Sequence, residues 1–404
     1  MPNKPVGMGY LRVDGRLGIR NTLVVVYLVE CAWHVANETA LAFRGQGVQL
    51  IGFRGCYPND HAERIMHAVC THPNVGAVVL VSLGCEAFER TGLQQAVRAS
   101  GRPCETVVIQ QTSGTEESIR QASEHVQTML ARLADTPRVP VALRDLIIGT
   151  VCGGSDATSG ISANPAVGRF FDRFIGLGGT AIFEETGELV GCEAIVRERG
   201  VTEEVGERAA AAVLKAAEFY TKMGHGSFAP GNAEGGLSTI EEKSLGAYAK
   251  SGSSRIEGVL YPGQRPDKPG LWLLDVVPDG IPMHGFPNVS DVTEIVEMAA
   301  CGAHLVLYTS GRGSVAGSAI APTVKVCGNP DTCARMPGDI DIDAGAIING
   351  TALLDDVAEA IMEKVNAMKN GALSKPEKLG HQEFDLLYKR FDLQDRFCRG
   401  HLCG

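Results

Sequence analysis

Short apolar runs alternate with helical segments along the first third of the chain, and this alternation constrains the fold more than any other feature of the sequence. Thr22–Leu28 (TLVVVYL) and Val75–Leu83 (VGAVVLVSL) are continuous apolar runs, typical of strands buried on both faces. Helical periodicity follows them over Ala32–Arg44 and Glu86–Ala99. Strands that alternate with helices predict βαβ units, which join parallel strands. We therefore expect an α/β fold with mostly parallel sheets.

The alternation resumes beyond a polar linker predicted at Ala134–Arg138. Strands are expected at Asp145–Val151 and Thr180–Phe183, a long helix over residues 198–223, and a glycine-rich loop over His225–Ser238. A chain of 404 residues has room for two to three domains. We expect two domains, an N-terminal α/β domain over residues 1–140 and a C-terminal α/β catalytic domain over residues 141–404.

Charge and composition exclude several classes of protein. The 47 acidic and 37 basic residues give a net charge of −10, which argues against nucleic acid as the main partner. The sequence contains no run of about 18 apolar residues that predicts a membrane span, and its N-terminus has no apolar segment typical of a secretory signal. Twelve cysteines at irregular spacing then point to a reducing cytoplasm.

Three cysteines end predicted strands in turns that contain glycine. They are Cys56 in FRGCYPND, Cys85 in VSLGCEAF and Cys152 in GTVCGGSD. If the strands are parallel, the three sulfurs emerge at one edge of a sheet, where they suit iron as Fe²⁺ or as a [4Fe–4S] cluster. For each single position, a small buried residue at a strand end is the simpler explanation. The iron site is therefore a hypothesis about the set of three.

Basic residues form a second candidate site. GYLRVDGRLGIRN and the later GRG contribute Arg12, Arg16, Arg20, Asn21 and Arg312. Arginine binds carboxylate or sulfonate through two parallel hydrogen bonds, so these turns predict an anion site. Solvated charges, or an ion pair with Asp14, are the alternative.

Lys243 lies in the segment STIEEKSLG, where Ser238 or Thr239 is expected to cap a helix over Thr239–Lys250. A lysine among carboxylates at a helix start is a candidate general acid or base. Helix capping explains the serine, the threonine and Glu241 without any catalytic role.

Several long motifs in this order resemble the altronate/galactarate dehydratase family: GYLRVDGRLGIRN, SLGCE, CGGSDATSGISANPAVG, PGNAEGGLSTIEEKSLGAYAKSG, TSGRG and DIDIDAGAII. The resemblance spans nearly the whole chain. It implies an iron-dependent lyase that dehydrates a sugar acid to a 2-keto-3-deoxy acid. The family also contains the large subunit of (2R)-sulfolactate sulfo-lyase, which releases sulfite and yields pyruvate.

Two departures from the family pattern bear on partners and substrate. Fused members carry a small N-terminal domain before the GY-R-DGR motif, which here begins at Gly9. The resemblance therefore implies a large subunit that works with a separate small subunit as an oligomer. The turn GCYPND differs from that of many sugar-acid dehydratases, which leaves the leaving group open.

The resemblance implies one chemistry for both substrates, a β-elimination from a 2-hydroxy carboxylate to a 2-keto acid. The hypothesis assigns the three cysteines to iron, the four arginines and Asn21 to the anionic substrate, Ser155 and Asp156 to the substrate hydroxyl, and Lys243 to proton transfer. The rival interpretations are a non-catalytic carboxylate-binding protein and a dehydratase-like chain that holds structural zinc.

Overall fold

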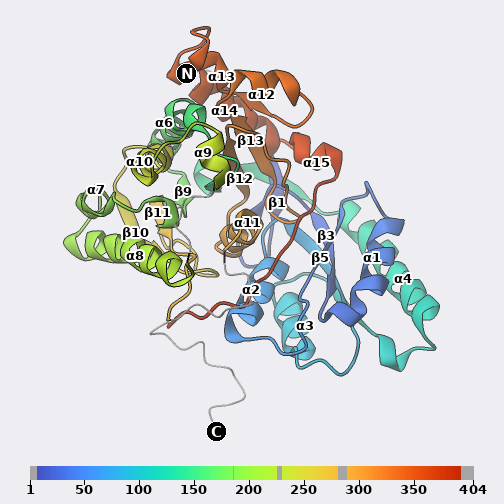
Figure 1. Ribbon diagram of the computed structural model, residues 1–404. Helices are drawn as coiled ribbons and strands as arrows, with labels where there is room; N and C mark the ends of the chain where they lie inside the picture. The colour runs from blue at the N-terminus through green and yellow to red at the C-terminus, as the bar shows by residue number, and fades with distance from the viewer. Residues whose placement is uncertain (1–6, 185, 225–229, 281–288, 393–404) are drawn as a thin grey trace.

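A computed structural model describes residues 7–184, 186–224, 230–280 and 289–392. The chain builds two parallel sheets with helices beside and between them (Figure 1). The expected α/β fold with parallel sheets is confirmed. Among the described residues, no helix is both long enough and apolar enough to span a bilayer.

The first sheet has four parallel strands in the order β4-β3-β5-β6, which are β3 (Thr22–Tyr27), β4 (Val48–Gly52), β5 (Val75–Ser82) and β6 (Cys104–Val108). Every residue of β5 is buried, as its β-branched run predicts for a central strand. Helices α1 (Trp33–Ala42) and α4 (Thr115–Ala134) cover one face, and α2 (Asp60–Cys70) and α3 (Arg90–Ala99) cover the other.

The second sheet has seven parallel strands in the order β10-β11-β9-β8-β12-β13-β14. These are β8 (Ile147–Cys152), β9 (Thr180–Phe183), β10 (Ile256–Leu260), β11 (Gly270–Leu274), β12 (Leu305–Ser310), β13 (Thr323–Cys327) and β14 (Ile342–Asp343). The chain moves from β8 to its neighbour β9, then to β10 at the edge of the sheet and back to β11 between β9 and β10. It then places β12, β13 and β14 on the other side of β8. The strand order therefore changes direction at β8, and ligands of open α/β sheets bind at the carboxyl end of such a strand.

Helices α6 (Ala163–Gly176), α10 (Ile240–Lys250) and α14 (Leu354–Lys369) pack on one side of the second sheet. On the other side, α11 (Asp291–Ala300) packs against α2 of the first sheet (Figure 1). Apolar side chains of both sheets, among them Val26 and Val306, belong to the same buried core. The two sheets are therefore joined through a hydrophobic layer that contains α2 and α11.

A small antiparallel sheet connects the two halves, with strands β1 (Gly7–Leu11), β2 (Leu17–Gly18) and β7 (Arg138–Val141). The predicted linker at Ala134–Arg138 is shorter than expected, because α4 continues to Ala134 and β7 begins at Arg138. Pro140 is tolerated in β7 because this strand lies at the edge of its sheet, opposite Met8.

Two predicted elements differ from the structure. The helix expected over 198–223 begins later, as α8 (Glu203–Lys222), because the Thr202 side chain caps its start, and a separate short helix, α7 (Glu193–Glu198), precedes it. The loop expected over His225–Ser238 contains the short helix α9 (Pro230–Glu234), and residues 225–229 lie outside the described part of the chain. Other short helices are α5 (Ala157–Ile161), α12 (Pro330–Arg335), α13 (Gly345–Ile348) and α15 (Lys375–Leu379).

Candidate active site

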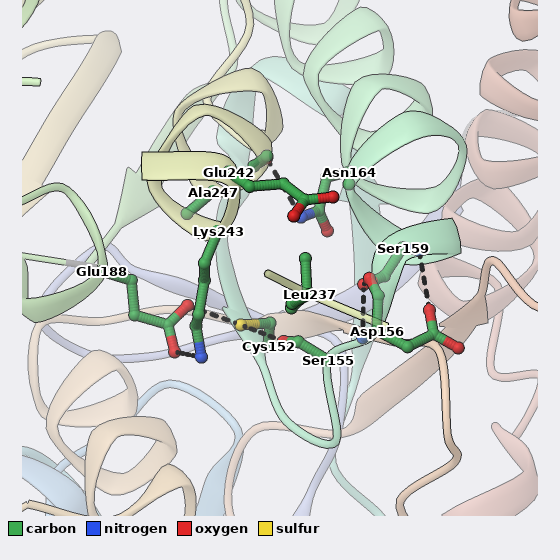
Figure 2. A pocket seen from close by; sticks show the side chains of 12 residues that line it. Cys152, Ser155, Asp156, Ser159, Asn164, Glu188, Leu237, Glu242, Lys243 and Ala247 are labelled. Carbon is green, nitrogen blue, oxygen red and sulfur yellow. Dashed lines mark hydrogen bonds and ion pairs between the residues drawn. The ribbon is translucent and has the colours of Figure 1, made fainter. Parts of the chain in front are cut away.

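A small pocket opens at the carboxyl end of β8, where the strand order changes direction. It encloses about 220 Å³, counting the part open to solvent, and its wall comes from the β8 turn, α5, α6, the loop after β9 and α10 (Figure 2). The lining residues are Cys152, Ser155, Asp156, Ser159, Gly160, Asn164, Glu188, Leu237, Glu242, Lys243, Gly246 and Ala247. Three of the predicted site residues, together with Cys152, therefore meet in one place.

Lys243 and Glu188 form the charged centre of this pocket (Figure 2). The Lys243 Nζ lies 2.5 Å from Glu188 Oε1, and the Cys152 thiol donates to Glu188 Oε2 at 2.8 Å. Ser155 Oγ donates in turn to Cys152 Sγ at 3.2 Å. Both charged side chains are partly or largely shielded from water, with 8% of Lys243 and 24% of Glu188 exposed. Shielding strengthens the attraction between the two charges relative to a surface pair.

Asn232 of α9 completes this cluster. With its amide oxygen facing the ammonium, it accepts from Lys243 Nζ at 2.8 Å and its amide nitrogen donates to the Ser155 carbonyl at 3.2 Å. The predicted helix cap is confirmed, because the Thr239 side chain accepts from the Glu242 backbone N–H at 3.2 Å. The cap fixes the first turn of α10 and thereby the direction of Lys243.

Asp156 has a structural role that the sequence did not reveal. Its Oδ1 accepts from the Ser159 backbone N–H at 3.0 Å, which caps α5. Its Oδ2 accepts from Asn329 Nδ2 at 2.9 Å. Gly311 packs so closely that a Cβ atom there would lie 1.8 Å from Asp156 Oδ1. Both carboxylate oxygens are thus held by protein groups, whereas the neighbouring Ser155 reaches the cysteine at the centre of the site.

Asn164 offers the pocket a hydrogen-bond acceptor. Its Nδ2 donates to the Gly246 carbonyl at 3.0 Å, which fixes the orientation of the amide. Its Oδ1 is buried and has no hydrogen-bond donor within the described ranges. An unsatisfied buried acceptor costs about 1–3 kcal/mol, so it favours a ligand that brings a donor.

Sequence reasoning missed Glu188, Asn164 and Asn232. Glu188 could have been found, because it follows the predicted strand Thr180–Phe183 and carboxyl ends of strands were the places where a site was expected. The two asparagines gave no separate signal, because they lie in motifs that were read only as part of a resemblance.

The N-terminal basic motif lies elsewhere. Arg12 donates to the Pro73 carbonyl at 2.7 Å, just before β5 begins, and to Asn21 Oδ1 at 2.9 Å. Arg16 pairs with Asp14 at 2.5 Å and donates to the carbonyl of Thr71. These contacts are at the amino ends of the strands, away from the carboxyl end of β8 where the pocket opens.

Arg20 and Asn21 hold helices in place. Arg20 pairs with Glu377 at 2.7 Å and donates to the carbonyls of Met368 and Ala372. The Asn21 Nδ2 donates to the Leu133 carbonyl at the end of α4. None of the four N-terminal residues predicted to bind substrate lines the pocket.

Arg312 follows β12 and lies near the pocket. Its guanidinium pairs with Glu234 of α9 at 3.1 Å and is 43% exposed. A Cβ atom on Gly235 would lie 3.3 Å from the Arg312 Cδ and 2.8 Å from the Asp156 Cβ. Of the arginines predicted to bind the substrate, Arg312 is therefore the one that lies beside a residue lining the pocket.

The three candidate metal ligands belong to two sheets. Cys56 and Cys85 follow β4 and β5, and a hydrogen bond of 2.9 Å from the Ala87 N–H to the Cys56 carbonyl joins their turns. Both are exposed, whereas Cys152 is buried at the end of β8. In the ranges that the structure describes, no three His, Cys, Asp or Glu side chains are placed to hold a metal ion. The described geometry does not fit a three-cysteine iron site.

Comparisons with known proteins match both parts of the chain to one family. Residues 9–134 match the family model of the D-galactarate dehydratase/altronate hydrolase second domain, and residues 143–391 match that of the D-galactarate/altronate dehydratase C-terminal domain.

Three curated relatives share 32% identity with the chain. The (2R)-sulfolactate sulfo-lyase subunit beta of Chromohalobacter salexigens aligns over 94% of this chain and 96% of its own length. Altronate dehydratase of Escherichia coli aligns over 88% of this chain and 73% of its own length. Galactarate dehydratase (L-threo-forming) of Escherichia coli aligns over 73% of this chain and 56% of its own length.

Proposed function

This chain belongs to the D-galactarate/altronate dehydratase family and is a lyase, and we propose that it dehydrates a sugar acid of the altronate or galactarate type to a 2-keto-3-deoxy acid. The observation that carries the proposal is the Lys243–Glu188 ion pair in a pocket at the carboxyl end of β8. An ammonium in such a place binds the carboxylate of a hydroxy acid and supplies a proton to a departing hydroxide.

The elimination needs two opposite proton movements. One group takes the proton from C2 while the C2–H electron pair forms the C2=C3 bond. The C3–O bond breaks at the same time, and the departing hydroxide takes a proton from the Lys243 ammonium and leaves as water. Glu188 and Asn232 orient the ammonium through contacts of 2.5 and 2.8 Å. The enol then becomes the 2-keto acid, as its hydroxyl proton returns to Lys243 and C3 takes up the proton removed from C2.

The lining of the pocket favours a polyhydroxy acid over a sulfonate. Its described charged residues are three acids and one amine: Asp156, Glu188, Glu242 and Lys243. Asn164 adds the unsatisfied acceptor Oδ1. Sugar hydroxyls donate to such acceptors, whereas a sulfonate only accepts hydrogen bonds and needs additional cations.

Elimination of sulfite from (2R)-sulfolactate is the second candidate. It is favoured by the alignment with the sulfo-lyase subunit beta, which covers 96% of that relative. The relative's name places it in an enzyme of more than one subunit. By analogy, we propose that this chain works with a separate small subunit.

A product assay separates the two candidates. The chain is purified without oxygen, alone and together with a candidate small subunit. Each preparation is incubated with D-altronate, galactarate or (2R)-sulfolactate. Formation of a 2-keto-3-deoxy acid without sulfite supports the dehydratase. Sulfite with pyruvate supports the second candidate, and no product from any of the three acids contradicts the proposed function.

Iron is the cofactor implied by the family resemblance, and it stays a prediction. Iron and acid-labile sulfide are measured on the same oxygen-free preparations. Iron together with acid-labile sulfide supports an iron–sulfur cluster, and iron without sulfide supports Fe²⁺. Active protein that contains no iron contradicts the prediction.

A further inference from the structure

A second group of ionisable side chains lies beside the β8 turn. Asp291 is the first residue of α11, which the Ser290 side chain caps. The Tyr308 hydroxyl donates to Asp291 Oδ2 at 2.5 Å and accepts from Ser314 Oγ at 3.0 Å. Lys325 stacks on the same tyrosine, with its Nζ 3.3 Å from the ring centre. Three neighbouring elements, α11, β12 and β13, thus bring a carboxylate, a phenol and an amine together.

Gly153 connects this group to the pocket. A Cβ atom at Gly153 would lie 1.8 Å from the Tyr308 hydroxyl and 2.1 Å from Asp291 Oδ2. Only glycine lets the turn approach the pair so closely. The residue before it, Cys152, lines the pocket and donates to Glu188. Asp291 therefore packs against Gly153, the residue that follows the pocket-lining Cys152 in the chain.

The surroundings of Asp291 make its carboxylate a stronger proton acceptor. Burial raises its pKa, and the negative charge of Glu188 acts in the same direction. The Tyr308 hydrogen bond and the charges of Lys243 and Lys325 oppose this, but the net shift is upward. A carboxyl group whose pKa moves toward neutrality is better suited to general base catalysis than an exposed one. The side chain is partly buried, and the charges of the pocket residues Glu188 and Lys243 act on it.

Lys325 is the lysine that packs beside the Tyr308–Asp291 pair, and its burial weakens its positive charge. The lysine is 1% exposed, and its Nζ has no hydrogen-bond acceptor among the described residues. Burial lowers the pKa of Lys325 to about 7. The acids that oppose this shift are Asp291 on α11, Glu383 near the C-terminus, and Asp341 and Asp339 before β14. At neutral pH and above, a large part of the Lys325 amine is uncharged, in contrast to the ion-paired Lys243.

We propose that Asp291 is the base that removes the C2 proton of the substrate, and that Tyr308 and Lys325 are positioning residues that hold it beside the pocket. This inference rests on the proposed function. It assigns the two proton movements to two sides of the β8 turn. Asp291 takes the proton from C2 and later returns it to C3, while Lys243 protonates the departing hydroxide and recovers the enol proton.

The first experiment removes the proposed base and tries to replace it. Asp291→Asn is expected to lower kcat by about 10³-fold with KM changed less than threefold, because loss of a general base costs about 10²–10⁴-fold. Asp291→Ala is expected to regain at least tenfold of its lost rate when formate is added, which a merely structural role does not produce. Asp60→Asn is the matched control, because Asp60 is likewise the first residue of a capped helix, α2.

The outcomes separate the inference from the proposed function. If the wild type turns over substrate and Asp291→Asn has the same kcat, Asp291 is not the base, although the proposed function stands. The same conclusion follows if formate does not rescue Asp291→Ala. A wild type that converts none of the three acids overturns the function and, with it, this inference.

The second experiment tests the positioning residue through the pH profile of kcat/KM. Lys325→Met removes a charge that lowers the pKa of Asp291, so the acid limb is expected to move up by as much as about one pH unit. Lys325→Arg keeps the charge throughout the acid limb, where Lys325 itself is largely protonated, and is expected to leave the limb in place. An acid limb that stays in place in Lys325→Met overturns the role of Lys325, even if the arginine variant does not fold.

Discussion

The N-terminal basic motif and the β8 turn look alike in sequence and differ in what their side chains contact. Both combine glycines with polar or charged residues next to strands. Arg12 and Arg20 direct their guanidinium groups at backbone carbonyls and at partners within the protein. Around the β8 turn, Lys243 and Glu188 instead face a pocket, and Asn164 keeps an acceptor without a donor in the described ranges.

The difference follows from the edge of the sheet at which each segment lies. The basic motif contacts Pro73 just before β5, and its Leu17 carbonyl contacts His304 just before β12, so both contacts lie at amino ends of strands. Its contact with Leu133 lies at the end of α4. The β8 turn lies at the carboxyl end of the strand where the order changes direction, and such ends form crevices. Charged residues at the first edge therefore stabilise the fold, while those at the second remain available for a substrate.

The largest expected effect comes from Lys243→Met. The variant keeps most of the aliphatic side chain and removes the cation, so kcat/KM should fall about 10³-fold or more. Lys268→Met is the matched control, because Lys268 forms an exposed ion pair with Glu257 at 2.6 Å. Steady-state kinetics with the substrate found in the product assay measures both. A Lys243→Met variant with kcat/KM within tenfold of the wild type would remove the ion pair from the mechanism.

Arg12→Met should instead reduce stability. Arg12 is 8% exposed, and its substitution leaves the Pro73 and Arg20 carbonyls and Asn21 Oδ1 without their donor. A loss of about 2–4 kcal/mol in the free energy of unfolding is expected from urea titration. At a temperature where the variant is folded, kcat/KM should stay within twofold. A tenfold rise in KM in the folded variant would instead place Arg12 in the substrate site and contradict a purely stabilising role for the basic motif.

Periodicity predicted most of the elements near the two edges, because buried parallel strands carry a strong local signal. The runs of β3, β5 and β9 are found where expected, and so is α10 with its Thr239 cap. The start of α11 was not predicted, although Ser290 and Asp291 form an ordinary helix start. Its segment follows a stretch rich in proline and glycine, and that composition hid the start.

The candidate site could be predicted only in part. Lys243 and Ser155 were both assigned to the reacting substrate in the hypothesis that followed the family resemblance, and both line the same pocket in the structure. Which sheet holds each cysteine depends on strand order, which no local pattern encodes, so Cys56 and Cys85 were grouped with Cys152. The arginine motif could not be assigned to an edge of the sheet for a related reason, because a sequence does not state which end of a strand a flanking turn will face.

A smaller effect concerns pH. Burial lowers the pKa of His72 and His304, both at the amino edge. Below pH 6.5 the unfolded chain binds protons that the folded protein excludes, so stability is full above this pH and falls as the pH drops. Each histidine should contribute a slope on the order of 1 kcal/mol per pH unit. The Asn74 N–H donates to His72 Nδ1 at 3.0 Å, and an asparagine side chain at position 72 can also accept this hydrogen bond. His72→Asn should therefore lower the dependence of the free energy of unfolding on pH between pH 6.5 and 5. An unchanged slope in urea titrations would assign the acid sensitivity elsewhere.

The smallest effect is expected from Cys85→Ser, and it tests the contrast from the side of the first sheet. Cys85 is exposed and follows β5, whereas the pocket belongs to the turn of β8 in the other sheet. We therefore expect kcat/KM and bound iron within twofold of the wild type, as for Cys31→Ser, another exposed cysteine. Metal analysis and kinetics on oxygen-free preparations decide the matter. Loss of both iron and turnover in Cys85→Ser alone would mean that the two sheets share one metal site, because an exposed thiol with no role at the pocket has no other route to both losses.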